Sequence, residues 1–415
     1  MKMTLKIMVL LLSLCAGAYA QVAPAATGPA PVGYGAGKNL NYALRYSETA
    51  DFGTSLSNWQ TSTVSGSLNY AGGNLRYPLS VNYSGGYTWT LVGPDYASGQ
   101  FHRMLISQGI DWRRLKVMVS DNVSYLPESP TTGFSGIPGI GEPIGGTPVA
   151  PTSSLSILTL NTHIVDNYAI GELEADLSHA TSFIVGGTSE LLRYPNNDGY
   201  NTDTQAGTGE FDWHADARNS VYGRYIYSDY SFPDYNINFV TDSELAGFRR
   251  LWSRNLSTDI AVGPERITSS SQAAVPNSSM VAATGLLHYQ LGFTSADVNF
   301  SRGINSGAGY LIGGQFDTVF ANFTRQFGPN FTFGLSGGYE RTEELSTSGF
   351  IINATFGGAQ GTWRLSRDII VFANYTGTNQ SSSTATALPS SVLNELLNVV
   401  GFGVGFSPRG TSLRQ

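Results

Sequence analysis

The sequence predicts an all-β protein, a single transmembrane antiparallel up-and-down β-barrel of about 18 strands. Three observations predict it: long segments that alternate between apolar and polar residues, connections that alternate between short and long, and the composition. Of 415 residues, 49 are glycine and 12% are aromatic, whereas only 13% are charged, against about 25% in an ordinary soluble domain. A closed barrel is the only β arrangement that crosses lipid without unpaired edges.

Residues 79–91 show the alternation most clearly. Every odd position is apolar, aromatic or glycine, from Leu79 to Leu91, and every even position is small or polar. A period of two defines a strand with two unlike faces. A strand of about ten residues or more matches the thickness of a bilayer.

The first 20 residues have the pattern of a secretory signal peptide. Lys2 and Lys6 precede an apolar stretch over 7–14, and Ala18 and Ala20 form a small-x-small cleavage site. The only cysteine, Cys15, lies inside this segment. The expected organisation is a signal peptide (1–20), a flexible periplasmic leader (21–38), the transmembrane barrel (39–406) and a C-terminal tail (407–415).

From residue 39 onward, strand-like segments follow one another, joined alternately by short turns and long loops, as in outer-membrane barrels. The pattern begins and ends on the same side, which requires an even number of strands. We count 18, or 16 if the weak pair near 204–229 is not a pair of strands. The candidates are 39–48, 60–70, 78–91, 100–112, 114–125, 160–177, 182–193, 204–213, 220–229, 239–252, 257–265, 281–291, 295–302, 315–325, 330–340, 350–364, 369–378 and 398–406.

The two faces of the clearest strands can be assigned. Over 330–340 the alternation places Phe331, Leu335 and Tyr339 toward lipid and Ser336 toward the lumen. A charge on the lipid face costs about 2–4 kcal/mol at the bilayer midplane, so charged residues should sort inward. Asp121 breaks this rule on its strand, and we expect it near an interface or at a bulge.

The tryptophans are placed as an aromatic girdle requires. Trp112, Trp213, Trp252 and Trp363 all sit beside short turns, and Trp89 lies at the other end of its strand. Membrane proteins concentrate tryptophan at the two membrane–water interfaces. Tryptophans of a soluble sandwich core would have no reason to lie beside turns.

The last strand alternates Val400, Phe402, Val404 and Phe406 with glycines. Here the chain resembles the Gram-negative outer-membrane β-barrel, porin-like families. The resemblance implies that the barrel assembly machinery reads Gly401, Val404 and Phe406, and that outer-membrane lipid and lipopolysaccharide surround the barrel. Two departures are Val400, where a polar residue is expected, and the continuation of the chain past Phe406.

Charges on the predicted lumen face suggest an electrostatic filter. Glu172, Glu174 and Asp176 share one inward face, roughly 7 Å apart. Crossed acidic and basic rows would create a transverse field that filters polar solutes, whereas isolated charges would merely solvate the lumen. The candidate inward arginines that could stand opposite the acids are Arg45, Arg103, Arg113 and Arg224.

Three functions remain open from the sequence. The first is passive diffusion of small polar solutes, because 16–18 strands enclose an aqueous bore. The second is a plugged structural barrel associated with exopolysaccharide or protein export, compatible with the Gly/Pro-rich loop 126–158, which either folds inward or stays outside. The third is an outer-membrane enzyme, but the candidates His163 and the Asp212/His214 pair complete no catalytic constellation.

No nucleic acid is expected as a partner, since the net charge is −7 and the pI about 5.3. No cofactor or metal is expected either, because inward acids roughly 7 Å apart suit an electrostatic screen better than one tight site. A homo-oligomer remains a possibility, but the alternation of residues does not single out one face of the barrel as its interface.

Overall fold

The computed structural model describes most of the chain from residue 38 to residue 413. None of the residues that it describes forms a helix long and apolar enough to cross a bilayer. The predicted signal peptide and nearly all of the leader fall outside them and stay predictions. The described ranges are 38–53, 59–74, 76–93, 98–128, 162–196, 199–307, 309–346, 349–383, 395–408 and 411–413.

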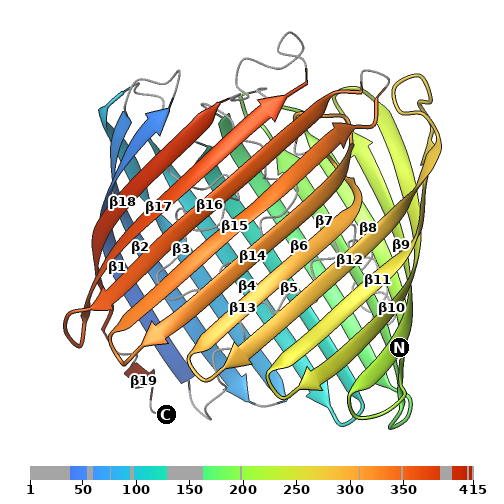
Figure 1. The fold of residues 1–415 in the computed structure, drawn as a ribbon, viewed down its shortest axis with the longest axis horizontal. Coiled ribbons are helices and arrows are strands. Elements are labelled where there is room, and N and C mark those ends of the chain that lie inside the picture. The colour runs from blue at the N-terminus through green and yellow to red at the C-terminus, as the bar shows by residue number, and fades with distance from the viewer. Residues whose placement is uncertain are drawn as a thin grey trace, which may run out of the picture.

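Eighteen strands form one closed antiparallel barrel, in which each strand pairs with its sequence neighbours and β1 pairs with β18 (Figure 1). The predicted fold class and strand number are therefore confirmed. The strands are β1 Lys38–Gly53, β2 Trp59–Asn74, β3 Tyr77–Val92, β4 Gly99–Trp112, β5 Leu115–Glu128, β6 Thr162–Asp176, β7 Thr181–Arg193, β8 Thr202–His214, β9 Asn219–Phe232, β10 Ile237–Ser253, β11 Leu256–Ser269, β12 Ser278–Leu291, β13 Thr294–Asn305, β14 Gly314–Phe327, β15 Phe331–Glu344, β16 Ile351–Arg364, β17 Ile369–Ser382 and β18 Leu396–Phe406.

The alternative of 16 strands is wrong, because β8 and β9 pair without interruption from Asp203–Ser231 to His214–Ser220. The short connections lie at one end of the barrel, which we call the turn end, and the longer ones at the loop end. The segment beyond Phe406 also joins the sheet. Its strand β19, Thr411–Leu413, pairs with Lys38–Leu40 of β1 at the turn end (Figure 1).

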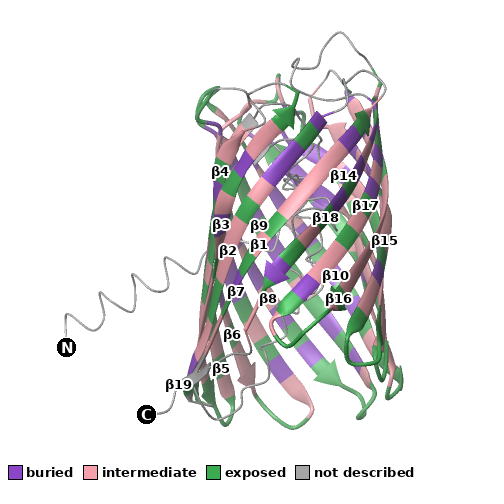
Figure 2. Ribbon diagram, turned by 90° about the vertical axis from the view of Figure 1, so that its left-hand side faces the viewer, coloured by how far each residue is buried: buried purple, intermediate pink, exposed green. Residues whose placement is uncertain are grey.

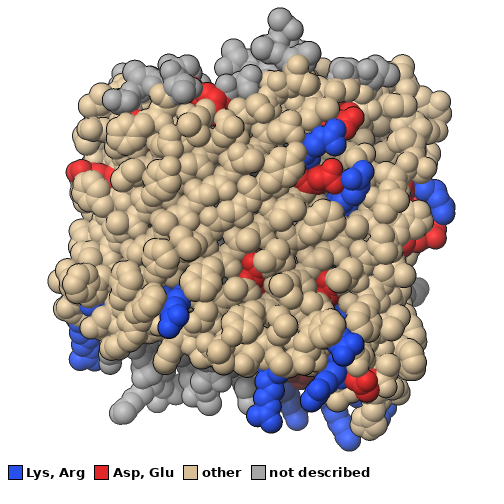
Figure 3. Space-filling view, in the orientation of Figure 1, with Lys and Arg blue, Asp and Glu red and all other residues tan. Residues whose placement is uncertain are grey.

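The strand register sorts the side chains onto two faces as the sequence predicts. On β15, Leu335 and Tyr339 face outward and are 44% and 39% exposed. Buried and exposed residues alternate along the strands (Figure 2). The face shown in Figure 3 is mostly uncharged, with most of its lysines and arginines near the turn end at the bottom. This outer surface suits the hydrocarbon of a bilayer.

The four tryptophans beside turns lie at the turn end of the outer surface, 46–55% exposed. Trp89 faces outward near the loop end of β3, with its ring centroid 6.4 Å from that of Tyr46. These positions are the ones that two aromatic girdles require, and the girdle itself stays a prediction. The four are Trp112, Trp213, Trp252 and Trp363.

Asp121 faces outward midway along β5, opposite Ile106 and Ala169. The register is continuous through this position on both sides, so the predicted bulge is wrong. Its Oδ1 accepts a hydrogen bond of 2.7 Å from the Nδ2 of Asn167 on β6. The amide thus provides one hydrogen bond to the carboxylate at a position where little water is available to do so.

We predict that Leu335→Lys destabilises the barrel, because its side chain faces outward midway along β15. In lipid vesicles the free energy of unfolding in urea should fall by about 2–4 kcal/mol. Ser336→Lys is the matched control, since Ser336 faces the lumen one position further on. Equal losses for both variants would mean that the two faces are assigned wrongly.

Candidate functional site in the barrel lumen

The β13–β14 hairpin leaves the barrel wall near the loop end. Pairing between β12 and β13 stops at Arg302, whereas pairing between β13 and β14 continues to Asn305 and Gly314. Residues 303–316, which we call the hairpin tip, are therefore free of β12. Every described residue from 303 to 311 is buried, although an outer loop would be exposed. The hairpin tip folds into the lumen.

Ile304 anchors this inward bend. Its N–H donates to the Glu265 carboxylate of β11, and its carbonyl accepts a 3.1 Å hydrogen bond from the Tyr230 hydroxyl of β9. Hydroxyls of Thr241 and Ser243 on β10 also donate to Glu265. The hairpin gives up backbone pairing with β12 at this point, and these side chains satisfy the freed polar groups.

Glycine makes the close turn of the hairpin tip possible. Gly309 has φ +72°, and a Cβ built there would lie 2.2 Å from the ring of Tyr194. Its carbonyl accepts a 2.5 Å hydrogen bond from the N–H of Tyr200 in the β7–β8 loop. An L-residue at this position would therefore be strained in its backbone and also clash with the aromatic ring.

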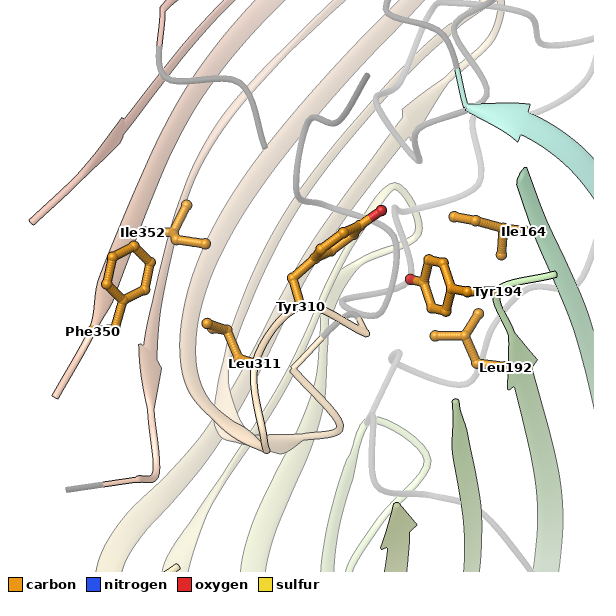
Figure 4. Close-up of a cluster of buried hydrophobic side chains, with 7 residues drawn as sticks. All are labelled: Ile164, Leu192, Tyr194, Tyr310, Leu311, Phe350 and Ile352. Atoms are coloured by element: carbon orange, nitrogen blue, oxygen red, sulfur yellow. The ribbon is translucent and has the colours of Figure 1, made fainter. Parts of the chain in front are cut away.

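Tyr310 and Leu311 of the hairpin tip join opposite walls of the barrel (Figure 4). The Tyr310 ring meets that of Tyr194 edge to face, with centroids 5.5 Å apart. Since β7 and β16 are nine strands apart in a ring of 18, this cluster, which we call the lumen bar, spans the barrel. Its members are Ile164, Leu192, Tyr194, Tyr310, Leu311, Phe350 and Ile352.

Tyr200, in the loop between β7 and β8, holds the hairpin tip through its backbone and packs against a second apolar cluster that includes Ile304. Its ring packs edge to face on Tyr235, with centroids 4.9 Å apart. Burial raises the pKa of the Tyr200 hydroxyl, and the nearby Tyr235 and Glu344 raise it further. The hydroxyl therefore stays neutral at physiological pH.

The lumen has one charged half. The described inward positions of β4–β11 carry ten carboxylates and four cationic side chains, as the strand registers place them. An excess of acids makes this wall attractive to cations. The acids are Asp111, Asp166, Glu172, Glu174, Asp176, Glu190, Glu210, Asp212, Asp259 and Glu265, and the cations are Arg103, Lys116, Arg224 and Arg249.

The facing half of the lumen carries fewer charges. The inward positions of β16–β18 and of β2–β3 carry hydroxyl, amide, apolar and glycine residues over most of their length. The strands beside them add two pairs of charged side chains, Arg45 and Asp51 on β1 and Glu340 and Glu344 on β15. Thr376, Thr378 and Gln380 on β17 illustrate the uncharged lining. A solute in the bore would thus meet an acidic wall on one side and mainly neutral hydrogen-bonding groups on the other.

Arg249 organises the charged wall near the turn end. Its Nη2, Nη1 and Nε bind Glu210, Asp212 and Asp259 at 2.8, 2.5 and 2.9 Å. Arg224 shares Glu210 at 2.6 Å, and the Tyr222 ring lies 4.0 Å below the Arg249 guanidinium. Four neighbouring strands are linked through this one side chain.

The three acids that sequence analysis selected all face the lumen on β6, as predicted. Glu174 forms a salt bridge of 3.0 Å with Lys116 of β5, and the Lys116 side chain remains 53% exposed. Sequence reasoning placed Lys116 on the inward face but did not select it as a site residue. Glu172 and Asp176 flank this pair on the same face.

The predicted arginines are arranged differently from the expected opposing row. Arg45 and Arg103 face inward on β1 and β4, five and two strands from β6. Arg224 faces inward but pairs with Glu210. Arg113 lies in the turn between β4 and β5, so its predicted inward position is wrong. A row directly across from β6 would require about nine strands of separation.

The hairpin tip is the functional element that sequence reasoning missed. Its signal was present, because glycines and apolar residues such as Tyr310 and Leu311 occur together in a predicted outer loop. The same signal had been assigned to loop 126–158, of which residues 129–158 lie outside those that the structure describes. Whether that loop folds inward therefore stays a prediction.

The catalytic alternatives gain no support from the geometry. His163 faces outward on β6, its ring 5.9 Å from that of Tyr125. Asp212 and His214 lie at the turn end, where Asp212 is held by Arg249. The described residues contain no cluster of His, Cys, Asp and Glu that could hold a metal ion.

Comparisons with known proteins find likeness at the level of solved structures. No protein-family model and no curated protein matches the chain. It is similar to OccK5 (OpdH) of Pseudomonas aeruginosa, with 10% identity, TM-score 0.46 and coverage of 90% of this chain and 98% of that one. For OccAB3 of Acinetobacter baumannii the values are 9%, 0.46, 89% and 99%. For the P. aeruginosa outer membrane protein OpdK they are 8%, 0.43, 89% and 98%.

We predict that Gly309→Ala loosens the lumen bar and raises single-channel conductance in planar bilayers. The left-handed backbone costs an L-residue about 1–2 kcal/mol, and the clash with Tyr194 adds to this strain. Gly292→Ala is the control, because Gly292 also has positive φ but has open space around it in the β12–β13 turn. Unchanged conductance in Gly309→Ala would show that the bar does not limit the bore.

We predict that Arg249→Gln lowers the free energy of unfolding by about 3 kcal/mol, since it leaves neighbouring carboxylates unpaired. Urea titration of the folded barrel measures the loss. Arg250→Gln is the matched control, because Arg250 points outward, with its guanidinium 4.1 Å from the Trp252 ring. A loss no larger than that of the control would mean that the network adds little stability.

Proposed function

We propose that this chain is a bacterial outer-membrane channel for passive diffusion of small polar solutes, with a preference for cations over anions. The observation that carries the proposal is the lumen itself, whose charged wall holds ten carboxylates against four cationic side chains. A barrel of this strand number encloses an aqueous bore. Its apolar outer surface supports placement in a membrane.

The lumen bar supports a limit on solute size. Apolar side chains from the hairpin tip cross the loop-end half of the bore, between β6–β7 and β16. The charged wall continues below it toward the turn end, where Lys116 and Arg249 lie. A solute would pass an apolar constriction first and then an acidic surface, an arrangement that suits small polar molecules.

A plugged structural barrel, associated with exopolysaccharide or protein export, is the second candidate. The same lumen bar favours it, because side chains that join opposite walls also brace a closed barrel. Planar-bilayer conductance of the refolded mature protein separates the two. Stable open steps support the channel. If heat-shift electrophoresis shows that the barrel is folded and no conductance is measured, the plugged barrel is supported.

We predict that the triple variant Glu172→Gln, Glu174→Gln, Asp176→Asn weakens the cation preference. Removing three inward carboxylates reduces the negative potential of the bore. The reversal potential under a KCl gradient should shift toward zero. Glu343→Gln is the control, since Glu343 faces outward on β15 beside Arg341. An unchanged reversal potential in the triple variant would show that these three acids do not set the ion preference of the channel.

A further inference from the structure

The outward face of β10 and β11 carries a charged patch. Glu244 of β10 and Arg266 of β11 point outward, and their side chains are 55% and 59% exposed. They contact each other at 3.2 Å, between Glu244 Oε1 and Arg266 Nη2. Asp242 also points outward and accepts a hydrogen bond from the Tyr225 hydroxyl of β9. Acid and base thus lie together on a surface that would face lipid in a monomer.

Glu244 lies further from the loop end than the charges of two other outward ion-pair sites. It is the eighth residue of β10 counted from the loop end, whereas its partner Arg266 is the fourth of β11. The outward pair Arg193–Asp203 lies at the last residue of β7 and the second of β8, next to the loop end. The other network, on β13–β15, lies at the fourth residue of each strand from the loop end; its members are Arg302, Asp317 and Arg341. A charge that faces hydrocarbon costs more the deeper it lies, so the patch on β10 needs a polar neighbour more.

A groove lies beside the charged patch on the same outward face. It is a shallow, open hollow of about 560 Å³. Gly209 of β8 and Gly223 of β9 form its floor, and no atom lies within 4 Å of the position that a Cβ would take at either. Phe183 and Phe211 form one side, and Glu244 closes the other. An acyl chain could enter this space, but it could not pair with the carboxylate at the edge.

We infer that a second copy of this chain packs against this face, related by a two-fold axis that runs parallel to the barrel axis between β10 and β11. Two barrels in one membrane share the same orientation, so a residue meets partner residues of similar height. Glu244 and Arg266 satisfy this condition, because they already touch within one chain. Across the axis the Arg266 of each copy would meet two carboxylates of the other, Glu244 and also Asp242, which is the register partner of Arg266 on the same outward face.

The same axis brings an apolar surface to the groove. It places β9 opposite β12 of the second copy, whose outward side chains include Val281 and Leu287, 55% and 40% exposed. Apolar side chains facing a glycine floor allow close approach of the two sheets. Charge complementarity at the axis and an apolar side chain for each groove together favour a second copy over lipid.

The test is cross-linking of single-cysteine variants in native outer membranes. Ala246→Cys places a thiol beside the proposed axis, because Ala246 faces outward on β10 opposite Val262 of β11. Ala359→Cys is the matched control, an outward alanine on β16, six strands away. With a bismaleimide, the first variant should form a covalent dimer, and the second should remain monomeric.

A charge swap tests the polar contact. Glu244→Lys in the Ala246→Cys background should lose the cross-linked dimer, because each Arg266 would then face a lysine of the other copy in place of its glutamate, and only the Asp242 carboxylates would remain opposite four cations. Adding Arg266→Glu should restore it. Heat-shift electrophoresis checks that each variant folds.

The inference is overturned if Ala246→Cys gives no dimer while native mass spectrometry from lipid nanodiscs shows a monomer, or if Ala359→Cys cross-links equally. Neither readout depends on conductance, so failure here and failure of the proposed channel are distinguishable.

Discussion

Closure of the sheet through the β1–β18 pairing is the constraint on which the rest of this structure depends. In hydrocarbon, every backbone N–H and C=O must find a partner within the protein, and only a ring of strands leaves no edge. Ten residue pairs from Leu44–Phe406 to Gly53–Leu397 complete that ring. Once it is closed, the strand number must be even, and each residue has an outward or an inward side chain. The lumen and the lipid surface both follow from this one pairing.

The hairpin tip is the place where the chain departs from this regular ladder. Beyond Arg302 the pairing of β13 with β12 ends, and the lost backbone contacts are replaced by Glu265 and Tyr230. Leaving the wall brings a cluster of apolar side chains across a bore whose walls also carry many polar and charged groups. Buried carboxylate, glycine at positive φ and aromatic packing therefore act together, and the constriction depends on all three.

Charge is distributed unevenly on both surfaces of the barrel. Inside, β4–β11 carry most of the acids and face a wall with fewer charges, so the field is set mainly by one half of the lumen rather than by two opposed rows. Outside, Glu244 and Arg266 form an exposed ion pair that lipid hydrocarbon would solvate poorly. The two uneven distributions share strands β10 and β11, because alternate residues of the same strands supply the lumen wall and the outer patch.

The sequence by itself determined the strand number, the faces of strands such as β15 and the inward position of the β6 acids, because alternation with period two is local and the bilayer penalises every misplaced charge. Only the tertiary structure decided which arginines pair with which acids, that Arg113 lies in a turn, and that the β13–β14 loop forms the constriction. Those facts depend on contacts between strands far apart in sequence, such as Tyr310 with Tyr194. Alternation carries no information about distance across the barrel.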